Sequence, residues 1–207
     1  MPARRRAKPR LRRTQEQRRT ATIGKLLDAA AASLIDLGYA GATVQAICAR
    51  AGVSQGALFR HFPTREALMV AAGEDVGRRI LADYRRQLLA LRGRQEPLTL
   101  AMELVREHCR SRLNQAWFEL GVAARTNATL KRALRPVGAR YHADIEALAR
   151  QVLPELAATL GSRFPVLVDT LVAVFNGEVV QRLIVTQPAV EEARLELLAG
   201  LARLLAG

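Results

Sequence analysis

Apolar residues recur along this chain with the spacing of α-helices, and no stretch keeps the alternation of apolar and polar positions found in a half-buried strand. The first clear run begins at Thr20 and is followed by Gly38, which is expected to end the helix in a left-handed conformation. The valine-rich segment 166–172 is the one place where a strand could be hidden. The whole pattern predicts an all-α fold. The apolar face of the first helix carries Ile23, Leu26, Leu27, Ala30, Leu34 and Leu37.

Three further helices are predicted directly after this run, because a hydroxyl side chain that can cap a helix precedes each of them. Gly52 separates the first two and can supply the positive φ of a tight turn. The expected helices are 44–51 after Thr43, 55–62 after Ser54, and one from about Arg65 after Pro63 and Thr64.

The rest of the chain also has helical spacing. Apolar residues recur helically over 98–113 and over 130–152, where Pro136 is expected to kink the helix. Residues 164–186 are apolar on nearly every face, which predicts a helix buried on both sides. The wide leucine face of 190–205 needs a partner surface.

Positive charge is concentrated at the start of this 207-residue chain, which carries a formal net charge of +13. Residues 1–70 hold 13 basic and 4 acidic side chains, a balance of +9. Residues 1–19 hold nine Lys or Arg and one acid, so we expect them to form a disordered basic arm. Such an arm is either a solubility tail or a segment that binds DNA phosphates or a minor groove.

Little in the sequence points to catalysis, a metal or a cofactor. Cys48 and Cys109 have no C-x-x-C or histidine spacing near them, so neither a disulfide framework nor a zinc site is expected. His108, Cys109 and His142 could be imagined as a thiol nucleophile with a base, but adjacent helical residues point about 100° apart. No signal peptide or long apolar run is found. We therefore expect a cytoplasmic protein that is not an enzyme, has no cofactor and binds no metal.

The segment from Thr43 to Leu68 has the sequence pattern of a helix-turn-helix. The turn sets two helices at a steep angle, and the second helix then exposes its amino-terminal end. Residues 54–57 are small or polar there, so the backbone can approach a major groove while Gln55 offers its amide to an adenine edge.

This segment resembles the DNA-binding domain of the TetR (tetracycline-repressor) family of bacterial transcriptional regulators. The match runs from Ile23 to about Leu68, and V-S-Q-G-A-L-F-R-H-F-P-T-R-E-A-L at 53–68 follows the recognition-helix pattern of that family. The resemblance implies a three-helix DNA-binding domain at 20–66. It also implies a helical effector-binding and dimerisation domain at 67–207.

The resemblance carries DNA contacts over to individual residues. Phe59 stands where the family usually has a tyrosine, so one hydroxyl contact to phosphate is missing, and Arg60 and the basic arm are expected to compensate. Arg65 stands where the family usually has a lysine that binds a phosphate. The residues expected at the DNA are Thr43, Ser54, Gln55, Gly56, Ala57, Phe59, Arg60, His61 and Arg65.

The second half of the chain offers candidates for an effector pocket and a dimer interface. Aromatic residues could form the pocket wall and polar residues could orient a ligand, although aromatics at helical spacing are more often core residues. The pocket candidates are Trp117, Phe118, Glu119, Phe175, Asn176 and Glu178. The dimer candidates are Leu183, Leu197, Leu198 and Leu201, in two apolar helices that suit a four-helix interface between two copies.

Together these features predict a ligand-responsive transcriptional regulator. The expected mode of action is that of a repressor, which binds a palindromic operator as a homodimer and is released by a small apolar or amphipathic effector. The alternative is a sequence-neutral or architectural basic DNA-binding protein without an effector. A protein that binds anionic membrane surfaces through its arginines is a further rival, although we expect no membrane partner.

Overall fold

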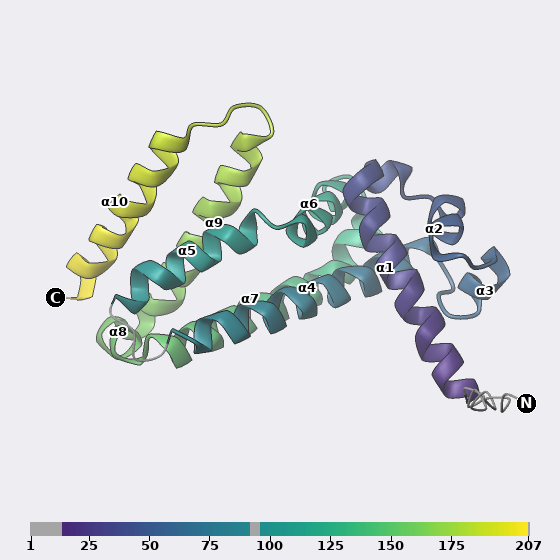
Figure 1. Ribbon diagram of the computed structural model, residues 1–207, viewed down its shortest axis with the longest axis horizontal. Coiled ribbons are helices and arrows are strands. Elements are labelled where there is room, and N and C mark those ends of the chain that lie inside the picture. The colour runs from purple at the N-terminus through teal and green to yellow at the C-terminus, as the bar shows by residue number, and fades with distance from the viewer. Residues whose placement is uncertain (1–13, 92–95, 207) are drawn as a thin grey trace, which may run out of the picture.

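The computed structural model describes residues 14–91 and 96–206, and these residues form helices joined by short turns (Figure 1). No strand occurs within them, and the valine-rich segment 166–172 lies inside a helix, so the all-α prediction is confirmed. The helices are α1 Gln15–Gly41, α2 Val44–Ala51, α3 Gln55–Phe59, α4 Arg65–Leu89, α5 Pro97–Cys109, α6 Arg112–Ala124, α7 Ala128–Val152, α8 Pro154–Leu160, the 3₁₀ turn η1 Gly161–Arg163, α9 Phe164–Arg182 and α10 Pro188–Ala206.

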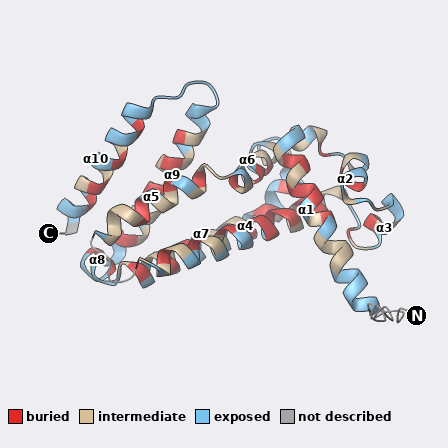
Figure 2. Cartoon of the chain, viewed as in Figure 1, coloured by how far each residue is buried: buried red, intermediate tan, exposed pale blue. Residues whose placement is uncertain are grey.

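The molecule is elongated. Helices α1, α2 and α3 lie at one end, and α8, α9 and α10 lie at the other (Figure 1). The long helices α4 and α7 pack side by side and connect the two ends. Figure 2 shows that the buried residues follow this central pair and the middle of α1, whereas the first turns of α1 are exposed.

Hydroxyl groups cap the helices of the amino-terminal end as the sequence predicts. Each Oγ accepts the backbone N–H of the residue three positions later, which satisfies one of the unpaired donors of the first turn. The distances are 3.1 Å from Ala46 to Thr43, 3.2 Å from Ala57 to Ser54 and 3.0 Å from Ala67 to Thr64.

The first helix begins earlier than expected. Thr14 and Gln17 form a reciprocal capping box that starts the helix at Gln15 rather than Thr20. Residues 15–19 are therefore helical, which corrects the prediction that the disordered arm extends to residue 19. The remainder of the expected arm, residues 1–13, lies outside the described residues.

Two helices deviate from their predicted shapes. Helix α3 ends at Phe59 instead of Phe62, and the chain then turns so that the Leu58 carbonyl accepts the N–H groups of both His61 and Phe62 at 2.9 Å. Helix α7 continues through Pro136 without a break. Because Pro136 and the residue four positions earlier, Arg132, both lie on the exposed face, water can hydrogen-bond the carbonyl that the proline leaves without a donor.

Helix α9 is not buried on both sides within one chain. Its inward face carries Phe164 and Phe175, both fully buried, but Val166 is 65% exposed and Val180 is 50% exposed. The prediction of a helix buried all round is wrong for the single chain. The exposed side carries these two valines together with polar residues, of which Asp169 pairs with His142 and Arg182 pairs with Glu191.

One hydrophobic core crosses the boundary between the two expected domains. The residues that hold the amino-terminal helices together, such as Leu34, Ile47 and Leu58, are in one cluster with Leu120 and Leu130 of the body. The amino-terminal helices are therefore packed onto the body, with α1 against α4 and α6, rather than tethered to it.

Gly73 allows the close approach of α4 to α6 within this core. A Cβ atom at this position would lie 3.0 Å from Leu120 Cδ1 and 3.4 Å from Trp117 Cζ3. A Cβ atom added to Gly24 on α1 would have no neighbouring atom within 4 Å.

We therefore expect Gly73→Val to destabilise the fold by about 1–3 kcal/mol, because the added methyl groups overpack a filled core. The measurement is urea unfolding followed by circular dichroism. Gly24→Val adds the same atoms in open space and serves as the control. Equal unfolding midpoints for the two variants would contradict the packing described for α4 and α6.

Candidate DNA-binding surface and internal cavities

The turn between α2 and α3 has the geometry that a helix-turn-helix requires. Gly52 has φ 65° and ψ 39°, a left-handed conformation that glycine adopts without strain. The N–H of Val53 donates to the Cys48 carbonyl at 3.1 Å, and the Val53 side chain packs against the core. Because the turn is held at both ends, the direction of α3 relative to α2 is set.

Helix α3 presents a narrow exposed edge. Leu58 is fully buried and fixes the inner face of the helix, whereas Gln55 and Gly56 at its start are exposed and Ala57 is half-buried. The Ser54 hydroxyl is used as the helix cap. This leaves the Gln55 amide as the longest polar side chain at the leading edge of the helix.

The other residues expected at the DNA surround this edge, with one exception. Phe59 is 46% exposed, Arg60 is exposed and His61 is half-buried. Thr43 caps α2, so its hydroxyl lies at the start of that helix. These four positions and the start of α3 belong to the same end of the molecule.

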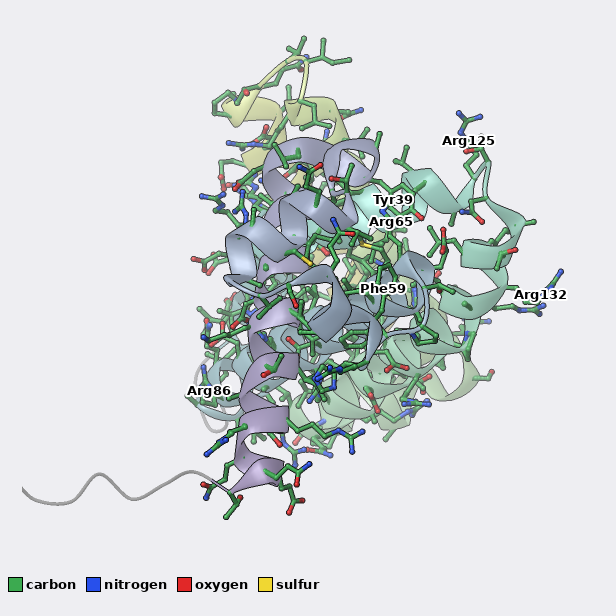
Figure 3. All side chains as sticks on the ribbon, turned by 90° about the vertical axis from the view of Figure 1, so that its right-hand side faces the viewer. Tyr39, Phe59, Arg65, Arg86, Arg125 and Arg132 are labelled. Atoms are coloured by element: carbon green, nitrogen blue, oxygen red, sulfur yellow. The ribbon has the colours of Figure 1, made fainter. Side chains whose placement is uncertain are left out.

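Arg65 is the exception, because its guanidinium binds the protein itself. Its Nε donates to the Ala42 carbonyl at 3.0 Å, and its Nη2 donates to the Tyr39 carbonyl. The guanidinium also lies over the Tyr39 ring, 4.2 Å from its centre (Figure 3). These contacts hold the end of α1 against the start of α4, and the phosphate contact expected of Arg65 stays a prediction.

The exposed start of α1 adds positive charge to this end of the molecule. Arg18 and Arg19 are exposed and form no ion pair with another described residue. The view along the long axis in Figure 3 shows the first turns of α1 and the labelled Phe59 on the same face. Arg18 and Arg19 thus lie on a helix at the same end of the molecule as α3.

The body contains two adjoining cavities. The first, called here the apolar cavity, measures about 40 Å³ and is lined by α4, α5, α7 and α9 with apolar side chains, apart from Tyr84. The second, called here the polar cavity, measures about 30 Å³ and also has His108, Asn114, Tyr141 and Asn176 in its wall. Both are lined by Tyr84, Val105, Ile145 and Val172, so these four side chains form a constriction between them.

The six pocket candidates do not come together. Of the six, Asn176 lines the polar cavity, and the other five line neither of these two cavities. Trp117 packs in the main core beside Tyr141, and half-buried Phe118 lines neither cavity. Glu119 accepts the Tyr39 N–H at 3.1 Å, which joins α6 to the end of α1.

Phe175 and Glu178 lie in the packing between α5, α9 and α10. Phe175 is fully buried there. The Glu178 carboxylate, 1% exposed, accepts from Arg110 at 2.5 Å and from Arg194 at 2.6 Å. A buried carboxylate requires such partners, so Glu178 acts as an anchor for α10 rather than as a pocket residue.

The sequence reading missed most of the polar cavity. Tyr84, His108, Asn114 and Tyr141 lie on four different helices, and only the packing of α4, α5, α6 and α7 brings them together. A buried asparagine within an amphipathic helix is the kind of signal that could have pointed to Asn114.

The dimer candidates separate into two groups. Leu183 is 78% exposed, Leu197 is 62% exposed and Leu201 is 48% exposed. Leu198 instead packs against the core cluster formed by α5, α9 and α10 within the same chain. Leu198 is therefore half-buried within its own chain, and its place in a dimer interface stays a prediction.

The segment Pro154–Arg182 is long and apolar enough, by length and composition alone, to cross a membrane. Gly161, with φ 52°, interrupts it, and the buried Glu178 ion pairs lie near its end. Core helices of folded proteins pass the same composition test. Its exposed valines are equally suited to contact another protein surface.

Comparison with known proteins supports the assignment that the helix-turn-helix geometry suggests. The family model described as "Bacterial regulatory proteins, tetR family" matches residues 26–72. The uncharacterized HTH-type transcriptional regulator Rv2912c of Mycobacterium tuberculosis is 39% identical over 189 residues, which cover 91% of this chain and 96% of that protein. The HTH-type transcriptional regulator CymR of Pseudomonas putida is 41% identical over 81 residues, 39% of this chain and 40% of that protein.

Solved structures agree over most of the chain. A crystal structure of the multidrug binding protein EbrR complexed with imidazole has a TM-score of 0.64 and 27% identity, and the match covers 86% of this chain and 93% of that one. SCO1917 from Streptomyces coelicolor A3, a TetR-family member, has a TM-score of 0.61 and 28% identity over 87% of this chain and 97% of that one. The chain therefore belongs to the TetR family of bacterial transcriptional regulators.

Proposed function

We propose that this protein is a ligand-responsive repressor that binds a palindromic operator as a homodimer and is released by a small apolar or amphipathic effector. The observation that carries the proposal is the exposed leading edge of α3 at one end and an exposed leucine-rich face at the other. The first suits a major groove, and the second suits another copy of the chain. We place this activity in the cytoplasm, where the DNA is.

Dimerisation is supported by the apolar surface of α9, α10 and the turn between them. Ile184 is 89% exposed and Leu204 is 80% exposed, beside the three exposed leucines named above. Large apolar side chains that are exposed in such number are costly in water unless a partner covers them. One helix-turn-helix also reads few bases, so two copies are needed for a specific site.

Effector response is supported by the position of α4. Arg65 at its start holds the end of α1, and Tyr84 and Leu88 farther along the same helix line the cavities. A ligand that binds better when α4 shifts would therefore change the spacing of the two α3 helices in the dimer. By linkage, operator DNA would weaken binding of that ligand by the same factor. EbrR, a structural relative, has been crystallised with imidazole and with malachite green.

A sequence-neutral DNA-binding protein is the second candidate, because the net charge of +13 favours any duplex. The two candidates differ in whether single side chains on α3 change the preference for one sequence over another.

Gln55→Ala is expected to reduce binding to a duplex selected from a random library by about 5- to 150-fold for each half-site, because each half-site loses one base contact worth about 1–3 kcal/mol. Binding to unselected duplex should stay nearly constant. Gel-shift titration at fixed salt measures both affinities. Gln115→Ala on the exposed face of α6 removes the same amide elsewhere and is the control. Equal loss on selected and unselected duplexes would support the sequence-neutral candidate instead.

The double variant Arg18→Gln, Arg19→Gln should lower the slope of log K against log salt by about 2 per subunit, and by about 4 for the dimer, since each phosphate contact contributes about 0.9. The control is Arg140→Gln with Arg163→Gln, which removes two exposed charges from the body. An unchanged slope in the Arg18 and Arg19 variant would exclude the start of α1 from the DNA interface.

Leu201→Arg is expected to convert dimers to monomers in sedimentation velocity and to abolish operator binding, because it buries a charge in the apolar interface. Val122→Arg changes a residue of α6 that is 64% exposed and should leave the dimer intact. An intact Leu201→Arg dimer would place the interface elsewhere.

A further inference from the structure

Several polar atoms of the two cavities have no hydrogen-bond partner among the described residues. Tyr84 is 5% exposed and lines both cavities, yet its hydroxyl makes no hydrogen bond to another described residue. Asn114 donates from Nδ2 to the Cys109 carbonyl at 2.8 Å and to Asn176 Oδ1 at 3.1 Å. Within the part of the chain that the structure describes, its own Oδ1 and the Nδ2 of Asn176 have no hydrogen-bond partner.

The bond to the Cys109 carbonyl fixes the direction of this pair. A carbonyl only accepts, so the nitrogen of the Asn114 amide must face it. Asn114 Oδ1 is then a free acceptor, and Asn176 Nδ2 is a free donor. Together with the hydroxyls of Tyr84 and Tyr141, which can each donate and accept, the polar cavity offers both donors and acceptors to an occupant.

The groups that line the cavities carry no unpaired charge. Burial raises the pKa of the Cys109 thiol to about 12, and burial also raises the pKa values of Tyr84 and Tyr141, so all three stay protonated at neutral pH. His108 has Nδ1 2.9 Å from the Leu104 carbonyl and Nε2 3.2 Å from the Asp83 carboxylate. No Asp, Glu, Lys or Arg lines either cavity.

The two cavities together suit a ligand that has one polar end and one apolar end. Beyond the constriction at Tyr84, the apolar cavity offers only hydrocarbon surface from α5, α7 and α9. The two cavities, with volumes of about 40 and about 30 Å³, have room for a few water molecules. A larger occupant must therefore displace the side chains of the constriction. Tyr84 and Leu88 lie on α4, the helix that holds α1, so such a displacement acts directly on the DNA-binding end.

We propose that the effector is an uncharged amphiphile: one hydroxyl or amide group held by Tyr84, Asn114 and Asn176, with a hydrocarbon portion that passes into the apolar cavity. This inference rests on the proposed effector response and names the chemical class of the effector. A hydroxyl or primary amide both donates and accepts, as the polar groups of the cavity require. A carboxylate or an ammonium would lose its hydration without gaining an opposite charge.

Three probes with the same eight-carbon chain test the class: octan-1-ol, octanoate and octyltrimethylammonium. Titration calorimetry on the full chain should show binding of octan-1-ol, with both ions at least about 100-fold weaker. Binding of either ion as tightly as the alcohol would overturn the proposal, as would absence of binding by all three.

Two variants test the residues. Tyr84→Phe and Asn176→Leu should each weaken octan-1-ol binding by about three- to tenfold, the loss of one hydrogen bond. Tyr39→Phe removes another buried hydroxyl without a partner, outside both cavities, and is the matched control. Because Tyr84→Phe keeps the ring, it remains informative if Asn176→Leu does not fold. Equal affinity in Tyr84→Phe and Tyr39→Phe would overturn the assigned contact.

DNA binding separates this inference from the proposed function. Octan-1-ol binding that leaves the affinity for selected duplex unchanged would overturn the effector response while keeping the ligand class as a property of the cavities. Sequence-specific DNA binding without any octan-1-ol binding would overturn the ligand class and keep the regulator.

Discussion

The docking of the end of α1 against α4 and α6 is the contact on which the rest of the structure depends. Arg65 donates to two carbonyls at that end and lies over the Tyr39 ring, while Glu119 accepts the Tyr39 N–H from the other side. These polar contacts are partly buried, so solvent weakens them less than surface ion pairs. They hold the helix-turn-helix in a defined orientation relative to the body, which a regulator with two reading heads requires.

A second set of charges does the same for the opposite end. Glu178 on α9 is bound by Arg110 from the end of α5 and by Arg194 on α10. Glu191 at the start of α10 adds bonds to Arg110 and to Arg182. This network orients α10 so that its exposed leucines and the exposed half of α9 are available to a partner, which connects the polar interior to the proposed dimer surface.

Local signals in the sequence predicted the amino-terminal end well. Thr43, Ser54 and Thr64 cap helices through contacts three residues away, and Gly52 takes the left-handed conformation of its turn, so short-range chemistry decides these features. The role of Arg65 and the make-up of the polar cavity could not be predicted in this way. Both depend on contacts between residues far apart in the chain, such as Asn114 with Asn176, and helical periodicity does not contain that information.

The shared hydrophobic core has a consequence for protein engineering. Leu120 and Leu130 of the body fill the same cluster as Leu34 and Ile47 of the reading head. A chimera cut after residue 66 would therefore divide this single hydrophobic core. Both pieces would then expose apolar area that is buried in the intact chain. Transplanting the DNA specificity of this protein onto a relative requires either the matching part of α6 and α7 to travel with it or an exchange limited to the exposed edge of α3.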